Sequence, residues 1–146
     1  MMIAIKNILL PTDFSEPATV AAKYALALAQ EFGSTVHLLH VIELVPAEVM
    51  LTHFSKQDVQ DKLSQHAADE LQKLNEALGD YNVPLETLIR SGNPAVEISR
   101  AAEDADIDLI VMGTHGRGGV AHALVGSVAE RTVRRAPCAV MTVRDS

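Results

Sequence analysis

The chain has 146 residues, of which 48% are hydrophobic and 21% charged, and its formal net charge at pH 7 is −7. These values are typical of one globular domain with a full core and exclude a disordered chain. The negative charge argues against non-specific binding to nucleic acids or anionic membranes, and the single cysteine, Cys138, excludes an internal disulfide and a cysteine-based zinc cluster.

The N-terminal part of the chain alternates between strand and helix patterns. Residues 3–10 predict a short buried strand, and residues 16–32 predict a helix capped by Asp13 or Ser15. Small apolar side chains at helical spacing mark the face of this helix that packs on a sheet: Ala18, Ala21, Ala22, Ala25, Leu26 and Ala29. Residues 35–42 are apolar on both faces, which predicts a central strand of a parallel sheet.

The middle of the chain begins with a segment that has no clear periodicity. This segment, Glu43 to Phe54, is long for a connection, so it is a candidate lid, binding loop or partner surface. Ser55 caps the next predicted helix, which runs to Leu78, and residues 83–89 follow as a third strand. The predicted core stripe of the helix is Val59, Leu63, Ala67, Leu71, Leu74 and Leu78.

The C-terminal part repeats the alternation. Asn93 is a predicted N-cap before a helix at 94–105 that opens on a proline. A strand at 106–112, a helix at 127–135 and a strand at 138–143 complete the chain. The fold class is therefore predicted to be α/β, a single-domain open five-stranded parallel sheet of Rossmann-like type with helices on both faces.

In such a sheet, ligands bind beyond the carboxyl ends of the strands, where the strand order reverses. A glycine-rich loop, residues 113–119, follows one of these ends, and Gly126-Ser127 stands at the start of the last helix. Free backbone N–H groups and a helix N-terminus bind anions, so we expect a phosphate-bearing ligand, a nucleotide in particular. A P-loop does not fit, because Gly119-Val120 stands where Lys-Ser/Thr is required, and a dinucleotide motif does not fit so late in the chain.

The glycines follow the pattern G-x2-G-x9-G-S/T, made by Gly113, Gly116, Gly126 and Ser127. With this pattern after a buried strand and Asp13 after the first strand, the chain resembles the universal stress protein family over essentially its whole length. The resemblance is to the nucleotide-binding branch, whose fold is adenine nucleotide alpha hydrolase-like. It implies an ATP-binding switch or sensor of the stress response, with Mg²⁺ or Mn²⁺ held largely by the nucleotide.

The resemblance also implies roles for individual residues. Asp13 is expected near the ribose and phosphates, and the backbone of Val41 at the adenine edge. The residues expected around the phosphates are Gly113, Gly116, Gly126 and Ser127. The full set of candidate site residues is Pro11, Thr12, Asp13, Val41, Met112, Gly113, His115, Gly116, Arg117, Gly126, Ser127 and Val128. The alternatives are that Asp13 and Ser127 are plain helix caps, the glycines turn residues, and His115 and Arg117 solvated.

The sequence gives little indication of catalysis or metal binding. We find no base or nucleophile constellation, and neither His37 nor His40 belongs to a metal-ligand motif such as H-E-x-x-H, so both are expected to be core residues with local hydrogen bonds. A dedicated enzyme is not indicated. The alternatives to a switch are a slow ATP hydrolase or phosphotransferase and a nucleotide-free protein-interaction module.

The last predicted strand, Cys138 to Val143, is apolar and would lie at a sheet edge, where strands tend to pair with another chain. The family resembled commonly dimerises there, so we expect a homodimer. The other possibility is that the segment after Glu43 or the charged tail, residues 144–146, covers the edge. No signal-peptide pattern or run of about 18 apolar residues is present, so we expect a cytoplasmic protein without membrane or nucleic-acid partners.

Overall fold

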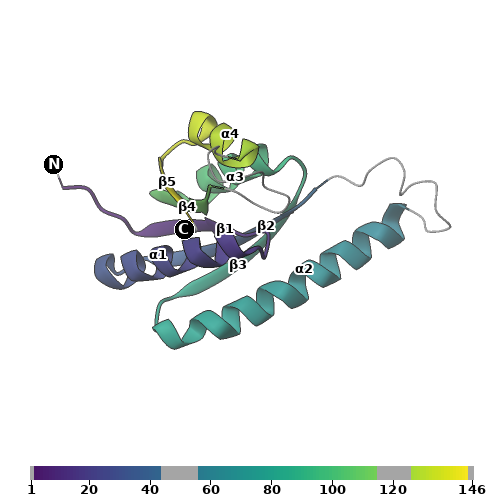
Figure 1. The fold of residues 1–146 in the computed structure, drawn as a ribbon, viewed down its shortest axis with the longest axis horizontal. Coiled ribbons are helices and arrows are strands. Elements are labelled where there is room, and N and C mark those ends of the chain that lie inside the picture. The colour runs from purple at the N-terminus through teal and green to yellow at the C-terminus, as the bar shows by residue number, and fades with distance from the viewer. Residues whose placement is uncertain (1, 44–55, 115–125, 145–146) are drawn as a thin grey trace.

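A computed structural model describes residues 2–43, 56–114 and 126–144. The described residues form a five-stranded parallel sheet with the order β3-β2-β1-β4-β5. The strands are β1 (Asn7–Pro11), β2 (Thr35–Ile42), β3 (Leu85–Ser91), β4 (Leu109–Gly113) and β5 (Ala139–Val143), and the helices are α1 (Glu16–Phe32), α2 (Lys56–Leu78), α3 (Pro94–Asp104) and α4 (Ser127–Arg135). Helices α1 and α2 lie on one face and α3 and α4 on the other (Figure 1). The predicted α/β class and open parallel sheet are confirmed.

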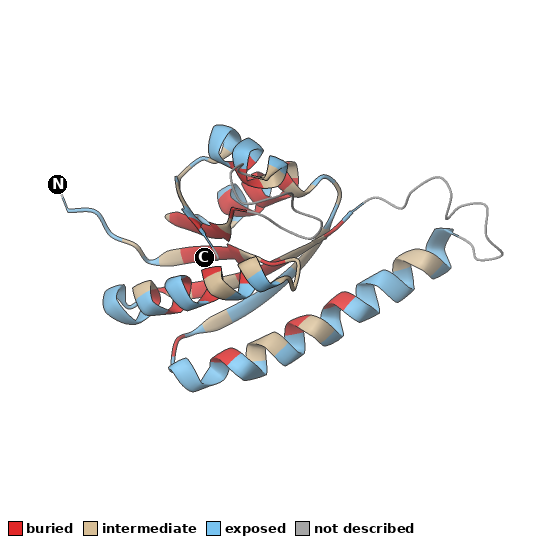
Figure 2. Ribbon diagram, viewed as in Figure 1, coloured by how far each residue is buried: buried red, intermediate tan, exposed pale blue. Residues whose placement is uncertain are grey.

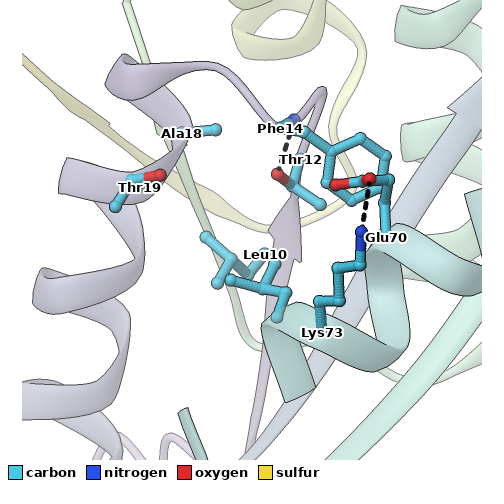
Figure 3. A pocket seen from close by; sticks show the side chains of 8 residues that line it. Leu10, Thr12, Phe14, Ala18, Thr19, Glu70 and Lys73 are labelled. Atoms are coloured by element: carbon cyan, nitrogen blue, oxygen red, sulfur yellow. Dashed lines mark hydrogen bonds and ion pairs between the residues drawn. The ribbon is translucent and has the colours of Figure 1, made fainter. Parts of the chain in front are cut away.

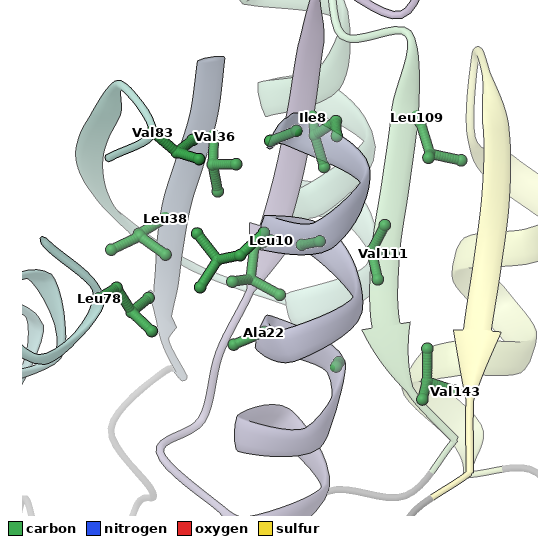
Figure 4. Close-up of a cluster of buried hydrophobic side chains, with 14 of the residues drawn as sticks. Ile8, Leu10, Ala22, Val36, Leu38, Leu78, Val83, Leu109, Val111 and Val143 are labelled. Atoms are coloured by element: carbon green, nitrogen blue, oxygen red, sulfur yellow. The ribbon is translucent and has the colours of Figure 1, made fainter. Parts of the chain in front are cut away.

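Successive residues of the central strand β1 enter two different cores. Ile8 and Leu10 pack with α1 and α2, as Figure 4 shows, while Leu9 packs with α3 and α4. All three side chains are fully buried. A strand buried on both faces must be apolar throughout, which explains why β1 and β2 appear in the sequence as continuous apolar runs.

Helix α1 has the predicted bounds, and its buried residues are the six predicted ones. Ser15 is the N-cap, since its side chain accepts a hydrogen bond from the Ala18 amide. The C-cap is Gly33, whose φ of 68° is a left-handed conformation that glycine adopts without strain. Of the two predicted caps, Ser15 therefore fills the role and Asp13 does not.

The first strand is shorter than predicted. Residues 3–6 lie outside β1, and Ile3 is 87% exposed. Pairing with β2 begins only at Asn7, opposite Thr35, while the Asp108 carboxylate accepts hydrogen bonds from the amides of Lys6 and Asn7. The predicted bounds of β3, β4 and β5 differ from the observed ones by one to three residues, because partner strands rather than local apolarity fix where pairing starts. Helix α3 ends one residue earlier than predicted, at Asp104.

The predicted core stripe of α2 is only partly correct. Ala67, Leu71 and Leu78 are buried, whereas Leu63 is 38% exposed. The N-terminal end of α2 extends past the strands, so its side chains have no sheet beneath them (Figures 1 and 2). The predicted cap Ser55 and most of the segment 43–54 lie outside the described residues. Over the described ranges, no helix combines the length and apolarity needed to cross a membrane.

Candidate functional site

The strand order reverses between β1 and β4. From β1 the chain proceeds to β2 and β3 on one side, while β4 and β5 lie on the other side. The predicted residues Pro11 and Gly113 end these two neighbouring strands. Ligands of open parallel sheets bind in the crevice at such a reversal, so topology brings two parts of the predicted site to the expected place.

The chain turns sharply after β1. The Thr12 hydroxyl accepts a hydrogen bond from the Phe14 amide at 3.0 Å, and an Asp13 carboxylate oxygen accepts one from the Ser15 amide at 3.0 Å. Such side-chain to backbone bonds are typical of tight turns. The turn leaves Asp13 half-buried at the carboxyl end of β1, next to the N-terminus of α1.

Phe14 holds the turn in an unusual conformation. Its φ of 65° lies in the left-handed region, which costs an ordinary residue about 1–2 kcal/mol. The Phe14 ring packs against His40 of β2 with a centroid distance of 4.6 Å, and His40 Nδ1 lies 2.8 Å from the Thr12 carbonyl oxygen. Neither Phe14 nor His40 is among the site residues predicted from the sequence, because no short-range pattern connects them.

The loop after β4 is closed at its base. The Gly126 amide donates to the Thr114 carbonyl at 2.6 Å, and the Thr114 amide donates to the Val143 carbonyl at 3.0 Å. Gly113 lies so close to α1 that a Cβ there would be 3.0 Å from both the Cβ and the carbonyl oxygen of Pro17. These contacts place both ends of the loop beside the turn after β1. His115, Gly116 and Arg117 lie outside the described residues.

Helix α4 starts at this closed base. Gly126 occupies its N-cap position, and Ser127 is its first residue and is exposed. Ser127 is therefore not the N-cap, so the alternative that Ser127 is a plain helix cap is wrong. The first N–H groups of a helix lack intrahelical acceptors, so a hydroxyl and several amides are available here to an anion. Met112 belongs to the core under α3 and α4, and Val128 packs against that core.

Val41 lies where the ladder between β1 and β2 ends. The last hydrogen bond of this ladder runs from the Thr12 amide to the Leu39 carbonyl at 2.8 Å. Alternate residues of a parallel strand point their N–H and C=O groups to the same neighbour. Val41, two residues after Leu39, therefore directs both groups toward the space beyond the end of β1.

A cavity of about 250 Å³ lies on the face covered by α1 and α2 (Figure 3). Its lining comes from β1, the following turn, α1 and α2: Leu10, Thr12, Phe14, Ala18, Thr19, Glu70, Lys73 and Leu74. Thr12 is the one member of this set that the sequence predicted as a site residue. The side chains of Glu70 and Lys73 pair with each other at 3.4 Å. This cavity lies across the sheet from Met112 and Val128, and the sequence could not reveal it because it depends on how α2 docks.

The described residues offer few groups for metal binding or nucleophilic catalysis. No group of three or more His, Cys, Asp or Glu side chains among them could hold a metal ion. His37 bonds Asn7 through Nε2 at 3.0 Å and faces Glu86. Burial raises the pKa of the Cys138 thiol, which keeps it protonated near neutral pH and poorly nucleophilic.

Comparisons with known proteins agree with this architecture. Residues 4–144 match the family model described as the Universal stress protein family. Universal stress protein MJ0531 of Methanocaldococcus jannaschii is 35% identical over 139 residues, which cover 95% of this chain and 82% of that protein.

Solved structures extend the likeness to three dimensions. The structure of MJ0577, from the same organism, superimposes with a TM-score of 0.86 at 32% identity, covering 97% of each chain. An Arabidopsis thaliana protein of the family, described with AMP bound, shares the fold with a TM-score of 0.68 at 18% identity, covering 95% of this chain and 91% of that one. From the match over nearly its full length, the chain belongs to the universal stress protein family.

Proposed function

We propose that this chain binds ATP at the strand ends and acts as a nucleotide-dependent switch in the stress response of the cytoplasm. The observation that carries the proposal is the closed base of the glycine-rich loop, where the Gly126 amide bonds the Thr114 carbonyl beside the N-terminus of α4. Amides and a serine hydroxyl at a helix start suit phosphate groups. That a related fold holds AMP supports an adenine nucleotide.

The residues present fit the proposed ligand. In this proposal the loop and Ser127 hold the phosphates, Asp13 lies by the ribose, and the Val41 backbone meets the base. Asp13 is the one carboxylate that the sequence predicts for this site, so Mg²⁺ or Mn²⁺ would be held mainly by the phosphates, as Mg²⁺ commonly is. The metal would neutralise the charge of the phosphates, and the chain would orient the nucleotide.

The test is to identify any nucleotide released from the denatured, purified protein by mass and to titrate the nucleotide-free protein with ATP and Mg²⁺. We expect binding with a rise in melting temperature, because a ligand that prefers the folded state stabilises it. Ser127→Ala and Asp13→Ala should each weaken binding roughly 10- to 100-fold, the range for hydrogen bonds to charged groups. Ser64→Ala, at an exposed position of α2 outside the candidate site, is the control. A flat titration of the wild-type protein would refute the proposal. Release of ADP would instead favour the alternative function, a slow ATP hydrolase.

We further propose that the switch is a homodimer paired through β5, the strand after Cys138. Strand β5 is at the sheet edge, and the Thr114 amide bonds the Val143 carbonyl, so odd-numbered residues of β5 face β4. Val140 and Thr142 therefore point their N–H and C=O groups outward, away from β4. An edge strand that presents such backbone groups pairs readily with a second copy.

We expect Thr142→Pro to convert this dimer to a monomer, because proline removes an outward amide and leaves the ladder to β4 intact. Sedimentation velocity at micromolar concentration measures the change, and Thr142→Val, which retains the amide, should stay dimeric. A wild-type protein that sediments as a monomer, or a proline variant that remains dimeric, would exclude this interface.

A further inference from the structure

His40 occupies a hydrogen-bonding position that the sheet would otherwise give to Val41. In the ladder between β1 and β2, the Thr35 amide bonds the Lys6 carbonyl and the Thr12 amide bonds the Leu39 carbonyl. Continued by one step, a parallel ladder would join the Val41 amide to the Thr12 carbonyl and the Phe14 amide to the Val41 carbonyl.

Side chains form hydrogen bonds with the Thr12 carbonyl and the Phe14 amide instead. His40 Nδ1 lies 2.8 Å from the Thr12 carbonyl oxygen. The Phe14 amide donates to the Thr12 hydroxyl at 3.0 Å, as Figure 3 shows. A carbonyl only accepts, so His40 Nδ1 carries the hydrogen. Among the described residues, neither of the two further ladder bonds to Val41 forms.

The backbone of Phe14 completes the arrangement. With φ at 65°, the chain leaves the direction of β1 at Phe14, and its ring packs on the imidazole that holds the Thr12 carbonyl, 4.6 Å between centroids. The ring contact with Phe14 and the hydrogen bond to Thr12 together hold the His40 side chain in place. A bulky residue in this conformation persists only where its surroundings enforce it, and His40 is the enforcing neighbour.

We infer that His40 is a positioning residue that keeps the N–H and C=O of Val41 free to bind the edge of a nucleobase. The inference rests on the proposed function and deepens it by naming what makes the base-reading edge available. An N–H next to a C=O matches a base that offers an acceptor beside a donor, as adenine does at N1 and N6. The phosphate cradle lies elsewhere, at α4, so base binding and phosphate binding are separable.

Two substitutions separate the hydrogen bond of His40 from its ring. His40→Asn places an amide Nδ2 at the position of Nδ1 and keeps the donor without the ring, whereas His40→Phe keeps a ring against Phe14 without the donor. Each variant is titrated with MgATP and with magnesium tripolyphosphate, which lacks a base. The ratio of the two affinities reports base recognition alone.

We expect the wild-type protein to prefer ATP over tripolyphosphate by roughly 10- to 100-fold, the worth of two backbone hydrogen bonds. His40→Phe should bring this ratio close to one and leave the affinity for tripolyphosphate unchanged. His40→Asn should retain most of the preference for ATP. The reverse order, with Phe retaining the ratio and Asn losing it, would show that the ring only packs and would overturn the inference while leaving ATP binding intact. Failure of the wild-type protein to bind either probe would overturn the proposed function and this inference with it.

Amide hydrogen exchange provides a second readout, and its decisive measurement uses only the wild-type protein. The Val41 amide should exchange rapidly without ligand, become protected by MgATP and remain unprotected with tripolyphosphate. In His40→Phe it should be protected without ligand, because the Thr12 carbonyl becomes available to it. A Val41 amide already protected in the ligand-free wild-type protein would contradict the inference directly.

Discussion

We expect the Leu71→Ala variant to lose about 2–5 kcal/mol of the free energy of unfolding, as large-to-small substitutions in a packed core do. Leu71 is 2% exposed and belongs to the core between the sheet, α1 and α2. Truncation leaves a cavity, because sheet residues such as Val36 and Leu38, buried in the same core, cannot collapse into the space. Urea denaturation followed by circular dichroism measures the loss.

Leu63→Ala is the matched control on the same helix, two turns earlier. Both leucines fit the apolar stripe of the sequence, but Leu63 is 38% exposed. Its truncation should change the free energy of unfolding by about 0.5 kcal/mol or less, since an exposed side chain has little contact to lose. Equal losses in the two variants would mean that α2 packs along its whole length, contrary to the arrangement in Figure 2.

We expect Gly113→Ala to destabilise the protein by about 1–3 kcal/mol, the usual effect of adding a methyl group where there is no room. The added Cβ would lie 3.0 Å from the Cβ and carbonyl oxygen of Pro17, so α1 or the end of β4 must move. Because the turn with Asp13 and the base of the glycine-rich loop meet here, the proposed binding of ATP should weaken as well. Thermal unfolding with and without MgATP measures both effects.

Gly79→Ala is the control for adding a methyl group to a glycine. No atom lies within 4 Å of a Cβ built at Gly79. The substitution reduces the freedom of the unfolded chain, so it should leave stability unchanged or raise it by up to about 1 kcal/mol. If Gly113→Ala behaved like Gly79→Ala, the close approach of β4 to Pro17 would not be a constraint on this fold.

The candidate site illustrates how far local patterns reach. The glycine spacing and the serine after it predicted a loop followed by a helix start. The structure closes the base of that loop between the Gly126 amide and the Thr114 carbonyl and begins α4 at Ser127. The contact of His40 with Thr12 joins residues 28 positions apart, through a strand pairing that no local pattern encodes. The cavity beside Phe14 likewise depends on where α2 docks.

The sequence by itself determined the elements whose signals are local. The bounds and buried face of α1 could be predicted, since the alanine spacing marks the face that packs on the sheet, although the choice of Ser15 over Asp13 as the N-cap was visible only in the structure. Strand β2 was equally clear, because a strand covered on both faces must be apolar throughout.

The tertiary structure decided what depends on partners. The order β3-β2-β1-β4-β5 places the ends of β1 and β4 side by side, and the pairing of Asn7 with Thr35 determines where β1 begins. The position of α2 leaves Leu63 exposed. The pairing of β1 with β2 brings His40 to the Thr12 carbonyl, which Val41 would otherwise bond. The physical reason is that caps and apolar periodicity act within a few residues, whereas pairing and packing join segments far apart in the chain, whose contacts exist only once the sheet has assembled.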